Sequence, residues 1–127
     1  MKTKTKQLST TRPNIKRQIG NQYEDQASQF LTAAGLKLIT QNYQCRFGEI
    51  DLIMQDGDTL VFVEVRYRSN KDFGGPLASV TTSKQNRILK TAKHYLSQKP
   101  FEVYCRFDII AFESAGEPIW LKNAFQE

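Results

Sequence analysis

Histidine and cysteine are scarce in this chain of 127 residues, and their scarcity argues against a zinc-type site. Such sites need several Cys or His ligands at short spacing. Here Cys45 and Cys105 lie far apart with no CxxC motif, and His94 is the single histidine. Both cysteines fall in strand-like runs, so we expect buried free thiols. Any metal bound by this chain is therefore expected to be a hard cation held by oxygen atoms.

Long apolar runs are also missing. No stretch approaches the roughly 20 residues needed to span a bilayer, and no apolar segment follows the basic N-terminus as a secretory signal would require. We therefore expect a cytoplasmic protein without a membrane partner. The hydrophobic fraction of 39% and the charged fraction of 24% are typical of a globular protein. The length suits one hydrophobic core.

Acidic residues are absent from the first 17 residues, which contain six of the 18 basic residues. The net charge of +5 comes entirely from this segment, because the remainder of the chain has a net charge of −1. Its Lys-, Thr- and Ser-rich composition predicts a disordered tail over residues 1–13, followed by a single domain over residues 14–127. The tail is either a solvated extension or an electrostatic arm for phosphates.

Hydrophobic periodicity predicts elements in the order αβββαββ. Apolar residues recur at helical spacing from Ile19 to Ala34, and again from Ile88 to Leu96. Thr82 and Gln85 form a capping-box pattern before the second helix. The five predicted strands span residues 36–46, 47–54, 59–68, 102–112 and 118–122. This order predicts a mixed α/β or α+β domain, with a central sheet flanked by helices.

Carboxylates gather on the hairpin that the second and third strands are expected to form. Side chains alternate along a strand, so Glu49 and Asp51 share a face, as do Glu64 and Arg66. If Asp56-Gly57 is the two-residue turn, Glu49 lies opposite Glu64 and Asp51 lies diagonal to it. The sequence therefore predicts three carboxylates on one face of the hairpin.

Carboxylates placed this close repel each other unless a proton or a cation neutralises them. Phe62, Val63 and Val65 surround Glu64 with core-type residues, so exposure to water does not relieve the repulsion. Mg²⁺ and Mn²⁺ prefer oxygen ligands and would fit such a cluster. We predict a metal site here, with a solvated acidic sheet edge as the alternative.

Other groups are candidates for the same site. Glu24 lies at the edge of the buried stripe of the first helix, either as a further ligand or as a boundary residue. Lys84 and Gln85 open the second helix at the end that favours anions, although capping explains Gln85 equally well. The second helix also has a basic outer face, suited to phosphate contact or to plain solvation, formed by Arg87, Lys90, Lys93 and Lys99.

Two runs carry a resemblance to a known family. Gly-Glu-Ile-Asp-Leu-Ile at residues 48–53 and Phe-Val-Glu-Val-Arg-Tyr-Arg at residues 62–68 resemble the uncharacterised bacterial YraN-like family. That family is similar to the PD-(D/E)XK, restriction-endonuclease-like superfamily, which includes archaeal Holliday-junction resolvases. The resemblance extends from about Gly20 to Phe125. It includes Tyr23-Glu24, Asn42-Tyr43, Phe73-Gly74, Lys84-Gln85, Arg106-Phe107-Asp108 and Asn123-Ala124-Phe125.

The resemblance implies a mixed sheet flanked by helices and metal-dependent cleavage of DNA. Carried over to matching positions, it makes Asp51 and Glu64 metal ligands and matches Glu24 to the extra helical acid of resolvase-like members. Glu49 belongs to the YraN-like motif, with no assigned role beyond its proximity. Arg66 stands where the superfamily has a lysine. An arginine stays charged, so it can stabilise charge on a phosphate but cannot act as a general base.

These features support three alternative functions. The first is phosphodiester hydrolysis with Mg²⁺ or Mn²⁺, on DNA that includes branched or structured forms. The second is a nucleic-acid-binding module without cleavage, and the third is a protein-interaction domain whose acids are structural. A two-fold dimer would present two equivalent sites to a symmetric junction. Under the first function, the expected nucleic-acid contacts are Arg66, Arg68, Lys84, Gln85 and Arg87.

Overall fold

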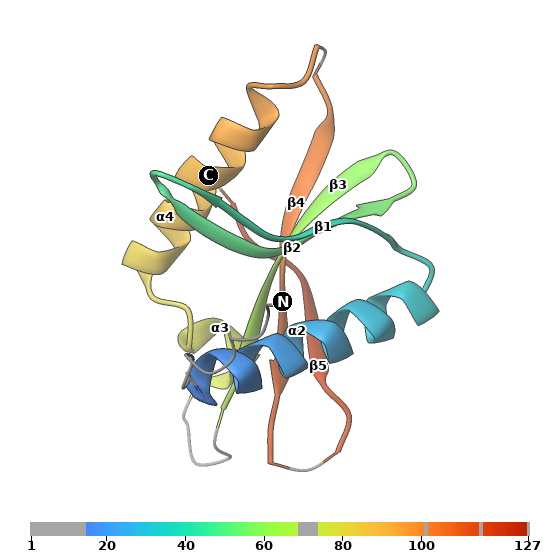
Figure 1. The fold of residues 1–127 in the computed structure, drawn as a ribbon, viewed down its shortest axis with the longest axis vertical. Helices are drawn as coiled ribbons and strands as arrows, with labels where there is room; N and C mark the ends of the chain where they lie inside the picture. Colours follow the sequence, from blue (N-terminus) through green and yellow to red (C-terminus); the bar gives the residue numbers. More distant parts are fainter. Residues whose placement is uncertain (1–14, 69–73, 101, 115, 127) are drawn as a thin grey trace, which may run out of the picture.

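The structure is a computed structural model that describes residues 15–68, 74–100, 102–114 and 116–126 (Figure 1). The predicted basic tail lies outside these ranges. The elements are α2 (Ile15–Ala33), β1 (Lys37–Cys45), β2 (Gly48–Asp56), β3 (Thr59–Tyr67), α3 (Gly75–Ala78), α4 (Thr82–Leu96), β4 (Tyr104–Phe112) and β5 (Ile119–Phe125). This order confirms the predicted one, with the short α3 added in a segment predicted as loop. Neither α2 nor any other described helix has the length and apolar character that crossing a bilayer requires.

A five-stranded sheet in the order β1-β2-β3-β4-β5 forms the centre of the fold. Neighbouring strands are antiparallel except β3 and β4, which are parallel. A parallel pair needs a long crossover connection, and the segment containing α3 and α4 provides it. The mixed sheet with flanking helices confirms the predicted fold class and is consistent with a restriction-endonuclease-like α+β fold.

Helices cover both faces of the sheet because its central strands are apolar on both sides. On one face, Ile88 of α4 packs in a cluster that includes Phe62 and Ile109. On the other face, Ala27 and Leu31 of α2 are fully buried in a second cluster. Burying a large apolar side chain contributes roughly 1.5–3 kcal/mol. The two helices are therefore fixed to the two faces of the sheet by packing.

Aromatic contacts fix the middle of α2 against the sheet. The ring centroid of Tyr23 lies 5.0 Å from that of Tyr67 and 5.1 Å from that of Phe112. Tyr67 and Phe112 are paired across β3 and β4. This stack places Glu24, the residue that follows Tyr23, beside the end of β3.

The two cysteines only partly match the expectation of buried thiols. Both are present as thiols, but Cys45 is half-buried and Cys105 is exposed. Cys105 is the second residue of β4, whose burial begins two positions later at Phe107. The strand-like pattern around Cys105 is real, but this end of the strand projects past the covered part of the sheet.

The turn between β2 and β3 lies one residue later than the sequence pattern predicts. Gly57-Asp58 forms the two-residue loop, and Asp56 pairs with Thr59. Gly57 has a φ of +61°, which a glycine adopts without steric cost. An Asp-Gly pair fits a turn in more than one frame, and backbone geometry decides the frame.

The later turn changes which carboxylates lie opposite each other. Leu52 pairs with Val63, so the next position along the strands places Asp51, and not Glu49, opposite Glu64. The predicted register is therefore wrong by two residues. A shift of two keeps each side chain on its face, so the predicted sharing of a face is unaffected.

The sheet divides just beyond this point. Residues Gly48 to Ile50 of β2 pair with β1, while residues Glu64 to Tyr67 of β3 pair with β4. In Figure 1 the two strands separate, β2 running toward α4 and β3 toward α3. We call this opening the strand fork. Backbone groups along the strand fork need partners other than the neighbouring strand.

Candidate functional site

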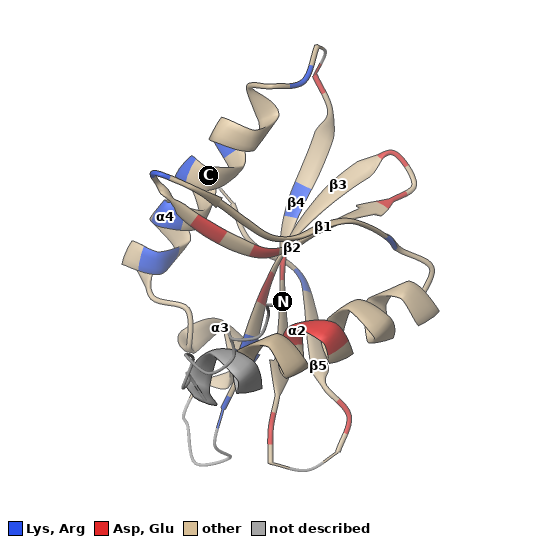
Figure 2. Cartoon of the chain, in the orientation of Figure 1, with Lys and Arg blue, Asp and Glu red and all other residues tan. Residues whose placement is uncertain are grey.

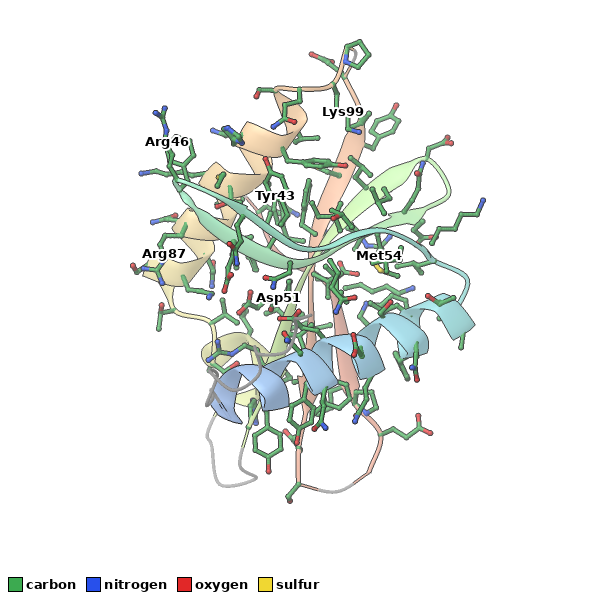
Figure 3. The ribbon with its side chains drawn as sticks, viewed as in Figure 1. Tyr43, Arg46, Asp51, Met54, Arg87 and Lys99 are labelled. Carbon is green, nitrogen blue, oxygen red and sulfur yellow. The ribbon has the colours of Figure 1, made fainter. Side chains whose placement is uncertain are left out.

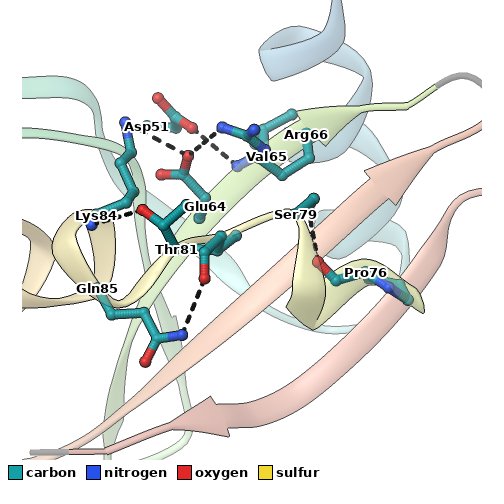
Figure 4. Close-up of polar contacts among 10 residues, drawn as sticks. Asp51, Glu64, Val65, Arg66, Pro76, Ser79, Thr81, Lys84 and Gln85 are labelled. Atoms are coloured by element: carbon teal, nitrogen blue, oxygen red, sulfur yellow. Dashed lines mark hydrogen bonds and ion pairs between the residues drawn. The ribbon is translucent and has the colours of Figure 1, made fainter. Parts of the chain in front are cut away.

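Asp51 lies in the strand fork (Figure 3). Its Oδ2 accepts a hydrogen bond of 2.8 Å from the backbone N–H of Val65 (Figure 4). This bond satisfies an amide of β3 at the place where β2 has turned away. Burial of the carboxyl group raises the pKa of Asp51, although the Val65 N–H and the charge of Lys84 lower it. The fold therefore holds this carboxyl group in a fixed position inside the fork.

Glu64 projects from β3 and is only 5% exposed, as the core residues around it predict. Two cations approach the same oxygen, Oε2: Arg66 Nη1 at 3.4 Å and Lys84 Nζ at 3.7 Å. Burial, and then the charge of Asp51, nevertheless raise the pKa of Glu64 to about 8. The positive charges of Arg66 and Lys84 therefore only partly offset the repulsion between Glu64 and Asp51.

Glu24 brings a third carboxyl group to the site from α2. Burial, and then the charge of Asp51 and a hydrogen bond with Asp51, raise the pKa of Glu24 to about 7. Its Oε1 is buried and has no hydrogen-bond partner within the part of the chain that the structure describes. Buried polar atoms are normally paired, and exceptions often mark functional sites. Three carboxyl groups, two of them with pKa values raised to about 7 and about 8, thus lie where α2 meets the strand fork.

A pocket of about 220 Å³ opens beside Glu24, and Glu49 and Asn42 also line it. Glu49 is exposed and accepts a hydrogen bond of 3.1 Å from Gln44 Nε2. Asn42 has a φ of +62°, a backbone conformation that few non-glycine residues adopt. Sequence reasoning missed Asn42 as a site residue. An asparagine inside a strand pattern, with its tolerance of positive φ, is the signal that could have found it.

The four predicted metal ligands do not converge on one point. Among residues 20–68, 74–100, 102–114 and 116–126, no group of three or more His, Cys, Asp or Glu side chains is arranged to hold a metal ion. The register explains the difference, because Glu49 lies farther along β2 and turns to Gln44 and the pocket. Asp51 and Glu64 remain as a pair, with Glu24 beside them. This pair still fits Mg²⁺, which commonly uses one or two carboxylates together with water and phosphate oxygens.

Arg68 and Gln85, two of the predicted nucleic-acid contacts, have partners within the fold. Arg68 is 6% exposed, and its Nη2 lies 3.0 Å from Glu113 Oε2. Gln85 Nε2 donates a 3.0 Å hydrogen bond to the carbonyl of Val80, so it secures the start of α4. The N-cap itself is Thr81, one residue before the predicted cap. Both side chains have structural partners, and burial removes Arg68 from the surface that nucleic acid could contact.

Exposed cations lie on α4 and on the neighbouring turn between β1 and β2. Arg87 and Lys90 are exposed on α4, and the helix has no acidic residue between Thr82 and Leu96. Arg46 is exposed at the turn, with its guanidinium 4.8 Å from the centroid of the Phe47 ring. Figure 2 shows the basic bands along α4 and acidic bands on β2, β3 and α2. Arg46 and Arg87 lie on the outer side of the molecule, away from Asp51 (Figure 3).

We expect Glu64→Gln to stabilise the metal-free fold at pH 8. The pKa of Glu64 is about 8 in the folded protein, against an ordinary value of 4.5. Between these values the folded state retains a proton that the unfolded state has released, so the free energy of unfolding falls as pH rises. Glutamine avoids this loss, which we expect to favour the variant by about 1–2 kcal/mol at pH 8 and not at pH 4.5. Urea unfolding in chelator at both pH values measures this, and a variant less stable than the native protein at pH 8 would contradict it.

The sequence is similar to a family of bacterial proteins. The model of the uncharacterised protein family UPF0102 matches residues 23–112, which include the strand fork and α4. A UPF0102 protein of Psychromonas ingrahamii is 62% identical over 105 residues, covering 82% of this chain and 86% of the relative. A UPF0102 protein of Nitrosomonas eutropha is 52% identical over 108 residues, covering 85% of this chain and 93% of the relative. The chain therefore belongs to the uncharacterised protein family UPF0102, the YraN family.

Proposed function

We propose that this chain is a metal-dependent endonuclease that hydrolyses phosphodiester bonds in DNA, including branched or structured DNA. One observation carries the proposal: the carboxyl groups of Asp51 and Glu64 meet in the strand fork with raised pKa values and only partial compensation by cations. Such a pair is stabilised by a further positive charge, and a hard divalent cation is the ion that carboxylate oxygens prefer. The resemblance to PD-(D/E)XK nucleases supports the same assignment.

Each residue of the fork has a role in this proposal. Asp51 and Glu64 would hold the ion as a pair, and Glu24 of α2, whose Oε1 is buried without a partner among the described residues, lies beside them. A bound Mg²⁺ or Mn²⁺ supplies a Lewis acid that lowers the pKa of water and offsets charge on the phosphate. The Val65 N–H keeps Asp51 in place. Arg66 contributes a permanent positive charge beside Glu64.

A row of basic residues on α4 that begins at the fork supports a nucleic-acid substrate. Lys84 lies at the first turn of α4, and Arg87 and Lys90 follow at intervals of three residues along the helix. Three helical residues rise by about 4.5 Å, so positive charge extends in steps away from the carboxylates. Cations arranged in this way can neutralise successive phosphates of a backbone. The scissile phosphate would then lie at the fork end of this row.

The proposal is tested by incubating the native protein with supercoiled, linear and branched DNA in Mg²⁺ or Mn²⁺. We expect nicking or cleavage that a chelator abolishes, because the fork carboxylates act through the ion. A folded protein that leaves all three substrates intact in both metals would count against it.

A measurement of DNA binding beside the cleavage assay distinguishes a second function, binding of nucleic acid without cleavage. The observation that favours it is Arg66, because an arginine does not exchange a proton near neutral pH as a lysine can. In that case, binding would weaken steeply with salt but would be indifferent to chelator and to loss of Asp51. If binding of nucleic acid required the metal ion, this second function would be excluded.

A further inference from the structure

Lys84 occupies a position that its own helix disfavours. It is the third residue of α4, where the aligned peptide dipoles place partial positive charge. The cap does not depend on the lysine side chain, because Thr81 Oγ1 accepts the backbone N–H of Lys84 at 3.1 Å, which other residues would also donate. The helix therefore does not stabilise the positive charge of Lys84, and the stabilising contact must come from another element.

That contact is with Glu64 of β3, across the strand fork. Lys84 Nζ is 3.7 Å from Glu64 Oε2, and its side chain remains 28% exposed. The ammonium therefore has one side toward the carboxylate and access to solvent on the other. Figure 4 shows it approaching from α4, opposite the approach of Arg66 from β3. A phosphate entering the fork would meet the ammonium of Lys84, which can turn from Glu64 to donate hydrogen bonds to it.

Arg66 is less able to follow a phosphate. Its Nη1 lies 3.4 Å from the same oxygen of Glu64, and its Nε is buried without a partner among the described residues. A guanidinium presents its donors in a rigid plane, whereas an ammonium on a four-carbon stem directs three donors freely. The geometry of Arg66 suits it to hold Glu64 in position.

We infer that Lys84 is a catalytic residue of this site: its ammonium moves from Glu64 to a non-bridging oxygen of the scissile phosphate and stabilises the negative charge that develops there, while Arg66 positions Glu64. The inference rests on the proposed function. In the step itself, the oxygen of water bonds to phosphorus as the bond from phosphorus to the leaving ester oxygen breaks. The water gives up one proton to solvent, and the leaving oxygen takes one from solvent. Lys84 keeps its protons throughout and acts by charge alone.

The test compares Lys84→Met with a matched control, Lys37→Met. Lys37 is exposed at the start of β1 and pairs with Gln55, at the other end of β2 from the fork. Cleavage is measured in Mn²⁺ over a range of DNA concentrations. We expect Lys84→Met to lower kcat about 10²-fold with KM changed only a few-fold, because a donor to the transition state is lost. Lys37→Met should cleave as the native protein does.

A second variant separates charge from shape. Lys84→Arg keeps the positive charge, so we expect it to recover part of the lost kcat, as a role through charge predicts. Melting curves establish that each variant is folded. An unchanged kcat in Lys84→Met, or an effect on KM alone, would overturn the inference. If the native protein still cleaves DNA in that experiment, the proposed function stands. A native protein inert in both metals would overturn both.

Discussion

Replacing Asp51 by alanine is expected to lower metal-dependent cleavage of DNA by about 10³-fold or more, since several kcal/mol of Lewis-acid stabilisation disappears with the ion. Asp51 supplies one of the two carboxyl groups that meet in the strand fork. Its Oδ2 also accepts the 2.8 Å hydrogen bond from the Val65 N–H, so alanine removes both the ligand and its anchor. Nicking of supercoiled DNA in Mn²⁺ measures the loss.

Two further variants show whether the charge or the fold is responsible. Asp51→Asn keeps an oxygen that can accept the Val65 N–H but removes the negative charge, so it should fold normally and still be inactive. Asp58→Ala removes an exposed aspartate from the turn of the same hairpin and should retain full activity. Native activity in Asp51→Asn would contradict the assignment of Asp51 as a metal ligand.

Asp108→Ala is expected to destabilise the fold by about 3–5 kcal/mol, a large part of the 5–15 kcal/mol typical of a domain. Asp108 is fully buried and accepts hydrogen bonds from three donors: Arg106 Nε at 3.1 Å, Trp120 Nε1 at 2.9 Å and the backbone N–H of Asn123 at 2.9 Å. Alanine would leave these donors without their acceptor, and unsatisfied buried donors are costly. Urea unfolding of the native protein and the variant measures the difference.

Asp56→Ala is the matched control for this prediction. Asp56 contacts the same arginine, with its Oδ2 2.9 Å from Arg106 Nη1, but its side chain is 38% exposed. Exposed ion pairs contribute at most about 1 kcal/mol, so we expect a small effect. Similar losses of stability in Asp56→Ala and Asp108→Ala would contradict the role given to burial.

Asp108 also shows why a motif in a sequence does not by itself identify a site. The Arg106-Phe107-Asp108 run belongs to the family resemblance, and a carboxylate in an apolar strand resembles a catalytic residue. In the structure, the register between β4 and β5 shifts between Phe107 and Ile109. Asp108 joins the two strands at this irregularity through Trp120 and Asn123. Its partners are structural, and nothing in the local pattern distinguishes that role from catalysis.

The element order could be predicted because it depends on local periodicity. The apolar stripe of α4, including the buried Ile88 and Ala92, is written at helical spacing in the sequence. The N-terminal boundary of α4 is harder to predict, because Thr81 and Thr82 are adjacent and either can be an N-cap. The structure selects Thr81, whose side chain accepts the N–H of Lys84. Local chemistry thus defines an element better than it defines the first residue of that element.

The site was predictable in composition but not in arrangement. Alternation along a strand depends on the neighbouring residues, so the shared face of Asp51 and Glu64 could be inferred. The turn frame at Gly57 and the division of the sheet depend on backbone geometry and on the pairing of β3 with β4, which are not local. The burial of Arg68 likewise follows from tertiary packing. These non-local features separate Glu49 from the Asp51–Glu64 pair.

Calorimetric titration with Mn²⁺ tests most directly the central claim that the strand fork is a metal site. The native protein is predicted to bind Mn²⁺ saturably, Asp51→Asn to lose that binding, and Asp58→Ala to retain it. Binding is also predicted to tighten as pH rises, because the pKa values of about 7 for Glu24 and about 8 for Glu64 make protons compete with the ion. A folded native protein that binds no Mn²⁺, or equal binding by Asp51→Asn, would contradict the claim.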